Sequence, residues 1–541
     1  MGTPTEVVLA PAPPRTLVSP ARALRTGVPD LVAVAVLLGL FPVVHDTGSL
    51  LHAPYYLDEA WVALSIRFPI ADLPLLASST PVGWAFLLRL VPDVNYLRVV
   101  PLVFHLLTIA GGYALGRQLG WRTPGLARVG GAACGAVVLL LPVQQIRHDL
   151  KQYTADAAAT LIVLALSAWV EAGWTRRRLV ALGAVLVAGT AFSEITAVAG
   201  CCAFGGLAVV ALGLRRWRRL VEVLVVGAVA GAGAGAVIAA TVLRSHSKAM
   251  DDFWAASFPT PGRLPHYLWE HGKGLLPLLG AGHRSVALLL ACACVLGIGT
   301  VFRLGRPGTG TALLLLPVAA VVMGVARVYP LLDLRTSHFL LVAVAATAGL
   351  GVAAAAALAS RLVRAAPPGL AAGALSAIVV AAFAAANANW YRFDGDDPAV
   401  GDPYKTPMAS EDIRSAVVYV KAHAASGDVV VLDETARYGF AFYWQPDGAR
   451  IAAPYGNTVG WTVEFAAPTV FVAPGTTGPD DVRRALDQAL DLATRRGQGI
   501  RVWLVRSHVF PDERAAWQVA LRDYRLDLVT SGVEPVAIVS R

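Results

Sequence analysis

Two adjacent carboxylates near the N-terminus are the first candidates for chemistry. Asp58 and Glu59 follow Tyr55-Tyr56-Leu57 and open an amphipathic stretch that runs to Arg67. Acidic residues at the start of a helix are favoured by the helix dipole, so helix capping is the simplest reading of the pair. Adjacent helical positions point about 100° apart. The two carboxylates are therefore predicted not to share a proton, and one could act as a base while the other orients a neighbour.

A second polar group precedes an apolar run, at Arg147-His148-Asp149-Leu150-Lys151-Gln152-Tyr153. Cations beside a carboxylate at a lipid boundary suit a phosphate with a sugar close to it. A solvated turn is the alternative.

A third group runs from Arg327 through Tyr329-Pro330 and Asp333 to Arg335. The guanidinium of Arg335 could bind a phosphate in a bidentate manner, or pair with Asp333. A fourth pair, Ser193-Glu194, is read as a tight turn. The histidines at 246, 266, 271 and 283 are too scattered for the spacing of metal ligands, and no metal site is predicted.

The composition places these groups in a membrane protein. Of the 541 residues, 56% are hydrophobic and 15% charged, whereas soluble domains carry about 25% charged residues. Apolar runs long enough to span a bilayer are expected near 29–45, 97–116, 125–142, 153–171, 178–192, 194–214, 219–243, 284–304, 309–327, 337–359 and 368–390. The run at 80–91 is too short and is predicted to lie at the membrane interface. The five cysteines all lie in apolar runs, which argues against a zinc site or a disulfide framework.

The distribution of positive charge predicts the orientation. Arginine clusters alternate with the other connecting loops, at Arg117, Arg122 and Arg128, at 176–178, at 215–219, at Arg303 and Arg306, and at Arg361 and Arg364. All five lysines fall on the opposite face. The positive-inside rule makes the arginine face cytoplasmic. The net charge of +9 therefore reflects membrane topology, and the chain lacks the basic stripe of a nucleic-acid-binding module.

The predicted domains follow from these assignments. Residues 1–28 form a cytoplasmic tail, 29–390 a transmembrane module of about eleven helices with a first outer loop at 46–96, and 391–541 a soluble extracytoplasmic α/β domain. In that domain GDVVVLD, PTVFVAP and IRVWLVRS read as buried strands, and 411–424 and 479–496 as helices. The chain is expected in the plasma membrane, with a cytoplasmic N-terminus.

The order of the polar groups resembles the GT-C class of membrane glycosyltransferases, in particular the protein O-mannosyltransferase and aminoarabinose-transferase-like bacterial family. The resemblance rests on the Asp58-Glu59 pair in the first outer loop, the turn Lys151-Gln152-Tyr153, and Tyr329-Pro330 followed by Arg335. The resemblance covers residues 30–390 approximately, and the family shares the general plan in which an outer domain follows the membrane helices at the C-terminus. The sequence departs from the family at Thr80-Pro81-Val82, where His-Pro-Pro would be expected, and this leaves the acceptor side of the site undefined.

The resemblance implies an inverting hexosyl- or pentosyltransferase that takes its sugar from a polyprenyl-phosphate donor. Asp58 would be the base that deprotonates the acceptor hydroxyl, with Glu59 beside it. The donor phosphate would be bound by fixed cations and a phenol, at Lys151, Tyr153, Arg335, Arg147 and Arg67. Asp149, His148 and Tyr329 would contact the sugar. The acceptor would be a glycan, lipid or protein of the cell envelope. No cofactor is expected besides the lipid-linked sugar donor. Whether the reaction requires a divalent cation is left open.

Other functions compete with this one. A glycan ligase that uses a polyprenyl pyrophosphate would differ only in the donor. A secondary transporter would require inverted repeats and charges near the bilayer midplane, whereas the charges here sit at span ends. A membrane scaffold with an outer binding domain would leave the Asp58-Glu59 pair dispensable.

Overall fold

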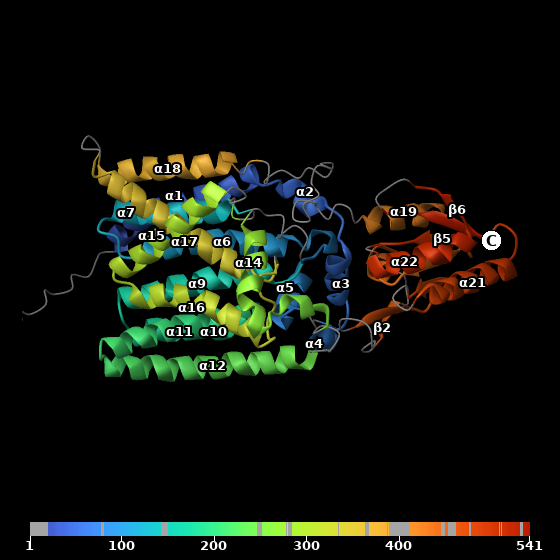
Figure 1. The fold of residues 1–541 in the computed structure, drawn as a ribbon, viewed down its shortest axis with the longest axis horizontal. Coiled ribbons are helices and arrows are strands. Elements are labelled where there is room, and N and C mark those ends of the chain that lie inside the picture. The colour runs from blue at the N-terminus through green and yellow to red at the C-terminus, as the bar shows by residue number, and fades with distance from the viewer. Residues whose placement is uncertain are drawn as a thin grey trace, which may run out of the picture.

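The computed structural model describes residues 20–76, 80–141, 150–245, 252–276, 279, 284–333, 335–362, 367–386, 388, 412–444, 449–452, 461–474, 478–507, 509, 511–530 and 534–541. Two parts stand out in Figure 1: a bundle of long helices and, at one end of it, a smaller domain of strands and helices formed by the C-terminal segment.

Every predicted apolar run forms a helix of the bundle. The helices are α1 (Pro20–Val44), α6 (Val99–Gln118), α7 (Pro124–Leu139), α9 (Tyr153–Ala172), α10 (Arg176–Thr190), α11 (Ile195–Gly213), α12 (Trp217–Ser245), α15 (Arg284–Arg303), α16 (Pro307–Val325), α17 (His338–Ala359) and α18 (Pro368–Ala386). A multi-pass helical membrane protein is thereby confirmed.

By length and composition alone, fewer helices than the predicted eleven or so qualify as membrane spans. Within the described ranges, nine helices are long and apolar enough to cross a membrane. The two that fall short are α7, with 16 residues, and α10, with 15. The helix α7 ends at Leu139, three residues before the end of the predicted run, and the first three residues of α10 are arginines.

Small residues let the helices of the bundle approach closely. A Cβ at Gly116 of α6 would collide with the backbone oxygen of Gly130 in α7, and one at Gly351 of α17 would collide with that of Ala293 in α15. Close backbone contact of this kind is the usual basis of helix association in membranes, where apolar burial gives little driving force. These contacts hold α6 against α7 and α15 against α17.

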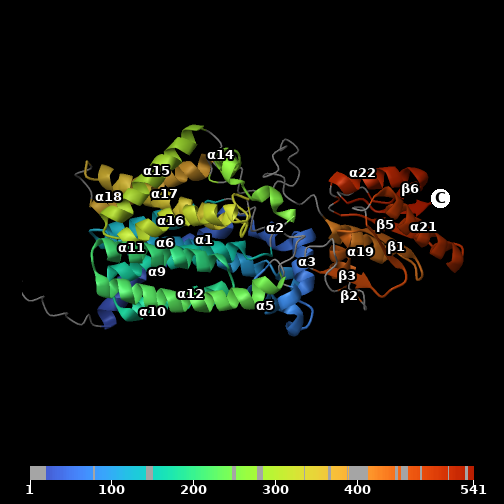
Figure 2. The same cartoon turned by 60° about the horizontal axis from the view of Figure 1, so that its bottom comes forward.

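Short helices cover one end of the bundle. The segment between α1 and α6, here called loop 1 (residues 45–98), contains α2 (Thr47–His52), α3 (Leu57–Ser65), η1 (Ile70–Asp72), α4 (Leu73–Leu76), α5 (Val82–Arg89) and η2 (Val94–Tyr96). The run at 80–91 is indeed only the eight-residue α5. Between α12 and α15 lie η3 (Ala255–Ser257), η4 (Pro261–Arg263) and α14 (Leu264–Leu275). In Figures 1 and 2, α3 lies between the bundle and the C-terminal domain.

The C-terminal domain is a mixed α/β fold, as predicted. Its elements are α19 (Ile413–His423), β1 (Val429–Asp433), α20 (Ala436–Trp444), β2 (Ala449–Ala452), β3 (Thr462–Phe465), β4 (Val470–Ala473), α21 (Pro479–Arg496), β5 (Val502–Val505), α22 (Pro511–Ala520), η9 (Leu521–Asp523), β6 (Arg525–Leu528) and β7 (Ala537–Ser540).

Five of these strands form one sheet in the order β4-β1-β5-β7-β6, and β2 and β3 form a separate antiparallel pair. The strands β4, β1 and β5 are parallel, with Val430 opposite both Val470 and Trp503. All five residues of β1 are buried, which is typical of a central parallel strand. The helix α20, which follows β1, shares a core with β1 and β5 through Phe440 and also packs on α3 of loop 1.

Candidate active site

The helix α3 places Asp58 in its first turn. Tyr56 is the N-cap, its carbonyl accepts from the N–H of Ala60 at 2.8 Å, and no side chain caps the helix. Residues 59–65 are buried, whereas 24% of the Asp58 side chain is exposed. Asp58 is therefore the carboxylate of the adjacent pair that a substrate could reach.

Two cations from separate loops meet at one oxygen of Asp58. The Nη1 of Arg335 donates to Oδ2 at 2.6 Å, and the Nζ of Lys151 donates to the same oxygen at 3.3 Å. The hydroxyl of Tyr56 lies 3.4 Å from this oxygen and also accepts from Arg335 at 3.3 Å. The sequence predicted a role for each of these three charged residues, and the structure brings them together.

The loop before α17 holds Arg335 in place. Asp333 accepts through Oδ1 from the backbone N–H groups of Arg335 and Thr336, at 3.1 and 3.3 Å. Asp333 thus caps the turn, while the guanidinium of Arg335 extends to Asp58. The ring of Trp254, which lies in the segment before α14, faces that guanidinium. The distance from the Cζ of Arg335 to the ring centroid is 5.9 Å.

Lys151 comes from the turn that leads into α9. Only 7% of its side chain is exposed, against 22% for Arg335. Its Nζ lies 5.8 Å from the ring centroid of Trp61, which is one turn after Asp58 on α3 and so on the same side of the helix. The ammonium group is therefore held between the Asp58 carboxylate and an aromatic face.

The electrostatics of the cluster keep Asp58 ionised. Burial acts to raise the pKa of Asp58, but Lys151 and Arg335 outweigh burial and hold that pKa well below 3.8. Asp58 is accordingly ionised at neutral pH. Within the part of the chain that the structure describes, both cations contact the same oxygen of this carboxylate.

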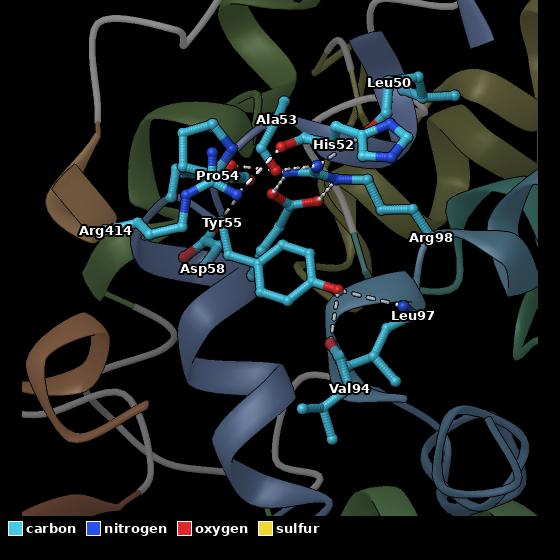
Figure 3. Close-up of polar contacts among 12 residues, drawn as sticks. Leu50, His52, Ala53, Pro54, Tyr55, Asp58, Val94, Leu97, Arg98 and Arg414 are labelled. Carbon is cyan, nitrogen blue, oxygen red and sulfur yellow. Dashed lines mark hydrogen bonds and ion pairs between the residues drawn. The ribbon is translucent and has the colours of Figure 1, made fainter. Parts of the chain in front are cut away.

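Glu59 has a different partner, Arg98 at the start of α6. The guanidinium donates from Nε to Oε1 at 2.8 Å and from Nη2 to Oε2 at 2.5 Å. Its remaining N–H groups donate to the carbonyls of Leu50, Ala53 and Pro54, at 2.9, 2.6 and 2.8 Å (Figure 3). The side chains of Arg98 and Glu59 are 1% and 0% exposed. All five guanidinium donors are used, and together they tie loop 1 to α6.

Tyr55 completes this attachment. Its ring lies under the Arg98 guanidinium at 4.8 Å, its hydroxyl donates to the carbonyl of Val94 at 2.8 Å, and the N–H of Leu97 donates to that hydroxyl at 3.1 Å (Figure 3). Sequence reasoning missed Arg98. Its position at the start of an apolar run was the available signal, because an arginine there is costly unless it has a buried partner.

Tyr329 belongs to a second polar group near the start of α9. Its hydroxyl lies 3.4 Å from Oδ2 of Asp156 in α9, whose Oδ1 accepts from Ser193 at 2.6 Å. Burial, Asp156, Tyr153 and Glu194 each raise the pKa of Tyr329 well above 10, so it is a neutral donor. Ser193 and Glu194, read from sequence as a tight turn, lie beside this group.

The other predicted site residues are placed as follows. Arg67 donates to the carbonyl of Phe442 at 3.2 Å and lies over the Phe442 ring at 4.2 Å, in the contact with α20. Arg147, His148 and Asp149 lie outside the described residues. Within the described ranges, no group of three or more His, Cys, Asp or Glu side chains is arranged to hold a metal ion.

Comparison with known proteins identifies the fold. No family model and no curated protein matches the sequence. Among solved structures, the chain is similar to ArnT from Cupriavidus metallidurans, with a TM-score of 0.51 and 15% identity over 95% of this chain and 98% of that one. It is also similar to the archaeal oligosaccharyltransferase AglB from Archaeoglobus fulgidus, solved with an inhibitory peptide and a dolichol phosphate, with a TM-score of 0.50 and 10% identity over 88% of this chain and 69% of that one. The GT-C fold expected from the polar motifs is confirmed.

Proposed function

We propose that this chain is an inverting glycosyltransferase that moves a sugar from a polyprenyl phosphate to a hydroxyl group of a cell-envelope acceptor. One observation carries the proposal: at the end of a membrane bundle with the GT-C fold, Oδ2 of Asp58 is shared by Lys151 and Arg335. A base and two cations are the groups that this transfer requires.

The two cations are the proposed ligands of the donor phosphate. A polyprenyl phosphate carries its phosphate at the lipid boundary, and Lys151 precedes α9 directly, while Arg335 stands three residues before α17. Arginine suits bidentate binding of a phosphate, and lysine supplies a compact charge. Tyr153, the first residue of α9, is proposed to border the same phosphate, and Tyr329 the sugar.

Asp58 is the proposed base. The acceptor oxygen attacks the anomeric carbon, the bond from that carbon to the phosphate oxygen breaks, and the acceptor proton passes to Asp58. The phosphate leaves on its lipid, with the added negative charge facing Lys151 and Arg335. A single displacement inverts the anomeric configuration.

Donor binding would also change the pKa of Asp58. In the free site both cations face Asp58, which makes it a weak base, since its pKa lies far below neutral pH. A bound phosphate competes for the same cations, so it raises the pKa of Asp58 toward that of an ordinary carboxyl. The base then becomes effective when the donor is in place.

The proposed orientation puts this site on the extracytoplasmic side. The arginine-rich ends of the helices gather at the far end of the bundle, where Arg117 and Arg128 both pair with Asp30, at 2.8 and 3.5 Å, and Arg306 donates to the carbonyl of Gln118. The positive-inside rule assigns that end to the cytoplasm and hence the C-terminal domain to the outside.

Transfer from a radiolabelled polyprenyl-phosphate sugar, with the protein in nanodiscs, tests the proposal. Lys151→Ala and Arg335→Ala should weaken donor binding and slow transfer together. Arg335→Lys should also be impaired, because an ammonium group does not replace a guanidinium fork. Arg218→Ala, an 84% exposed side chain at the opposite end of the bundle, is the matched control. Equal activity in all four variants would refute the phosphate site, and transfer only from a pyrophosphate-linked donor would reassign the donor class.

A further inference from the structure

The C-terminal domain contacts the helix that carries Asp58. The helix α20 packs along α3. Residues of loop 1 and of the C-terminal domain form one core there, which includes Trp61, Tyr438, Phe442 and Trp461. Polar contacts cross the same boundary: the N–H of Tyr55 donates to the hydroxyl of Tyr443 at 2.7 Å. The active-site helix is therefore enclosed by two segments far apart in the chain.

The helix α3 requires such support. It has nine residues and no side-chain N-cap, and an isolated helix of that length is marginal in water. Glu59 attaches one side of it to Arg98 of the bundle. The other side has the aromatic residues of the C-terminal domain as its partners.

Trp461 extends this support to a proposed phosphate ligand. Its ring stacks on Trp61 with centroids 5.8 Å apart and planes at 26°, and its Nε1 donates to the carbonyl of Leu76 at 3.0 Å. Trp61 in turn lies 5.8 Å from Nζ of Lys151. A path of direct contacts thus runs from the C-terminal domain through Trp61 to Lys151.

We propose that the C-terminal domain is a positioning unit of the active site, in which Trp461 and α20 fix α3 and, through Trp61, the ammonium group of Lys151. The inference rests on the proposed role of Lys151 as a phosphate ligand. Trp461 is a positioning residue because it acts through Trp61 and need not touch the donor.

The test measures binding of a polyprenyl phosphate and donor KM in the full chain in nanodiscs. Trp461→Leu removes the stacked ring, and donor affinity should fall roughly 2- to 30-fold, the range that a cation–π contact corresponds to. Trp461→Phe keeps a ring and should recover most of that loss. Glu464→Ala is the matched control: it lies in β3, three residues beyond Trp461, and pairs on the exposed surface with Arg450.

A double variant separates positioning from general damage. If Trp461 acts through Lys151, then Trp461→Leu should not weaken donor binding further in a Lys151→Ala background, because the contact on which it depends is already lost. Additive losses, or wild-type donor affinity in folded Trp461→Leu, would overturn the inference. Tyr443→Phe, which deletes only the acceptor for the Tyr55 N–H, tests the same boundary if Trp461→Leu does not fold.

The outcome for Lys151→Ala alone distinguishes the two proposals. If it binds the donor as the wild type does, the proposed function fails at its phosphate site. If it loses binding while the Trp461 variants keep it, the proposed function stands and the positioning role is wrong.

Discussion

The Nη1 of Arg335 lies 2.6 Å from Oδ2 of Asp58, although the two residues are 277 positions apart in the chain. Arg335 belongs to the loop before α17 and Asp58 to α3 of loop 1. Neither loop contains a complete site, and the helix bundle between them sets the distance.

Replacing Asp58 by Asn should abolish transfer while leaving the protein folded. The substitution preserves the shape of the side chain and removes the base, a loss that typically costs about 10²–10⁴-fold in rate. Initial rates at saturating donor and acceptor, with thermal unfolding as a check of folding, measure the effect. Near-normal rates would show that Asp58 is not the base.

The pH dependence of kcat should differ from that of kcat/KM for the donor. In the free enzyme Asp58 has a depressed pKa, so it stays ionised as the pH falls through 3.8, and protonation of Asp58 should not produce an acid limb of kcat/KM above that value. In the donor complex the phosphate engages both cations, so the acid limb of kcat should lie at higher pH. Coincident acid limbs would show that donor binding does not free the carboxylate.

The same shift has a consequence for folding. Because the pKa of Asp58 is lowered in the folded protein, its ionisation stabilises the fold fully above the unfolded value, about 3.9. That stabilisation is lost as the pH falls through the folded pKa. Midpoints of thermal unfolding between pH 3 and 7 should therefore fall less steeply at low pH in Asp58→Asn than in the wild type.

Arg98→Lys should destabilise the protein more than it impairs donor affinity. A lysine offers three donors where five are used, and it leaves Glu59 and the loop-1 carbonyls incompletely paired. Removing one partner of a buried pair costs about 3–5 kcal/mol; Arg98→Lys keeps the charge, so its cost should be smaller but should still lower the unfolding midpoint. Arg176→Ala, which breaks an ion pair whose arginine is 73% exposed, serves as the comparison. Equal shifts in the two variants would show that the buried pair contributes no more than the exposed one.

The proposed orientation can be tested with single cysteines. Ser426 is exposed in the turn before β1, and Ser426→Cys should react with a membrane-impermeant thiol reagent in intact cells. Arg218→Cys, at the arginine-rich end, should react only after permeabilisation. The wild-type chain gives the background from its own cysteines. The reverse pattern would invert the topology and place the candidate site in the cytoplasm.

Periodicity and charge were sufficient to predict most of the architecture. The apolar runs became the bundle helices, and the three predicted strands became β1, β4 and β5. Span length was less reliable, because the arginines that begin α10 extend the helix without making it apolar. Asp58, Lys151 and Arg335 could be selected from sequence because charges at a lipid boundary are costly and stand out from their surroundings.

Tertiary contacts of ordinary-looking residues could not be predicted. Trp461 is one aromatic residue in a β-rich segment, and its contact with Leu76 spans 385 positions. Arg67 resembled the other cations at the span ends, yet it contacts Phe442. Contacts between segments so far apart in the chain leave no local pattern in the sequence.

The attachment of Glu59 to Arg98 has a consequence for the order of assembly. During synthesis Glu59 leaves the ribosome 39 positions before Arg98, so loop 1 emerges before the arginine that organises it. The residues of α20 and Trp461 follow only after all the bundle helices have been made. A nascent chain halted after α18 would therefore contain Asp58, Lys151 and Arg335, but α3, which carries Asp58, would lack the contacts with α20 and Trp461. The surroundings of the Asp58 cluster are therefore complete only after the C-terminal domain has been made.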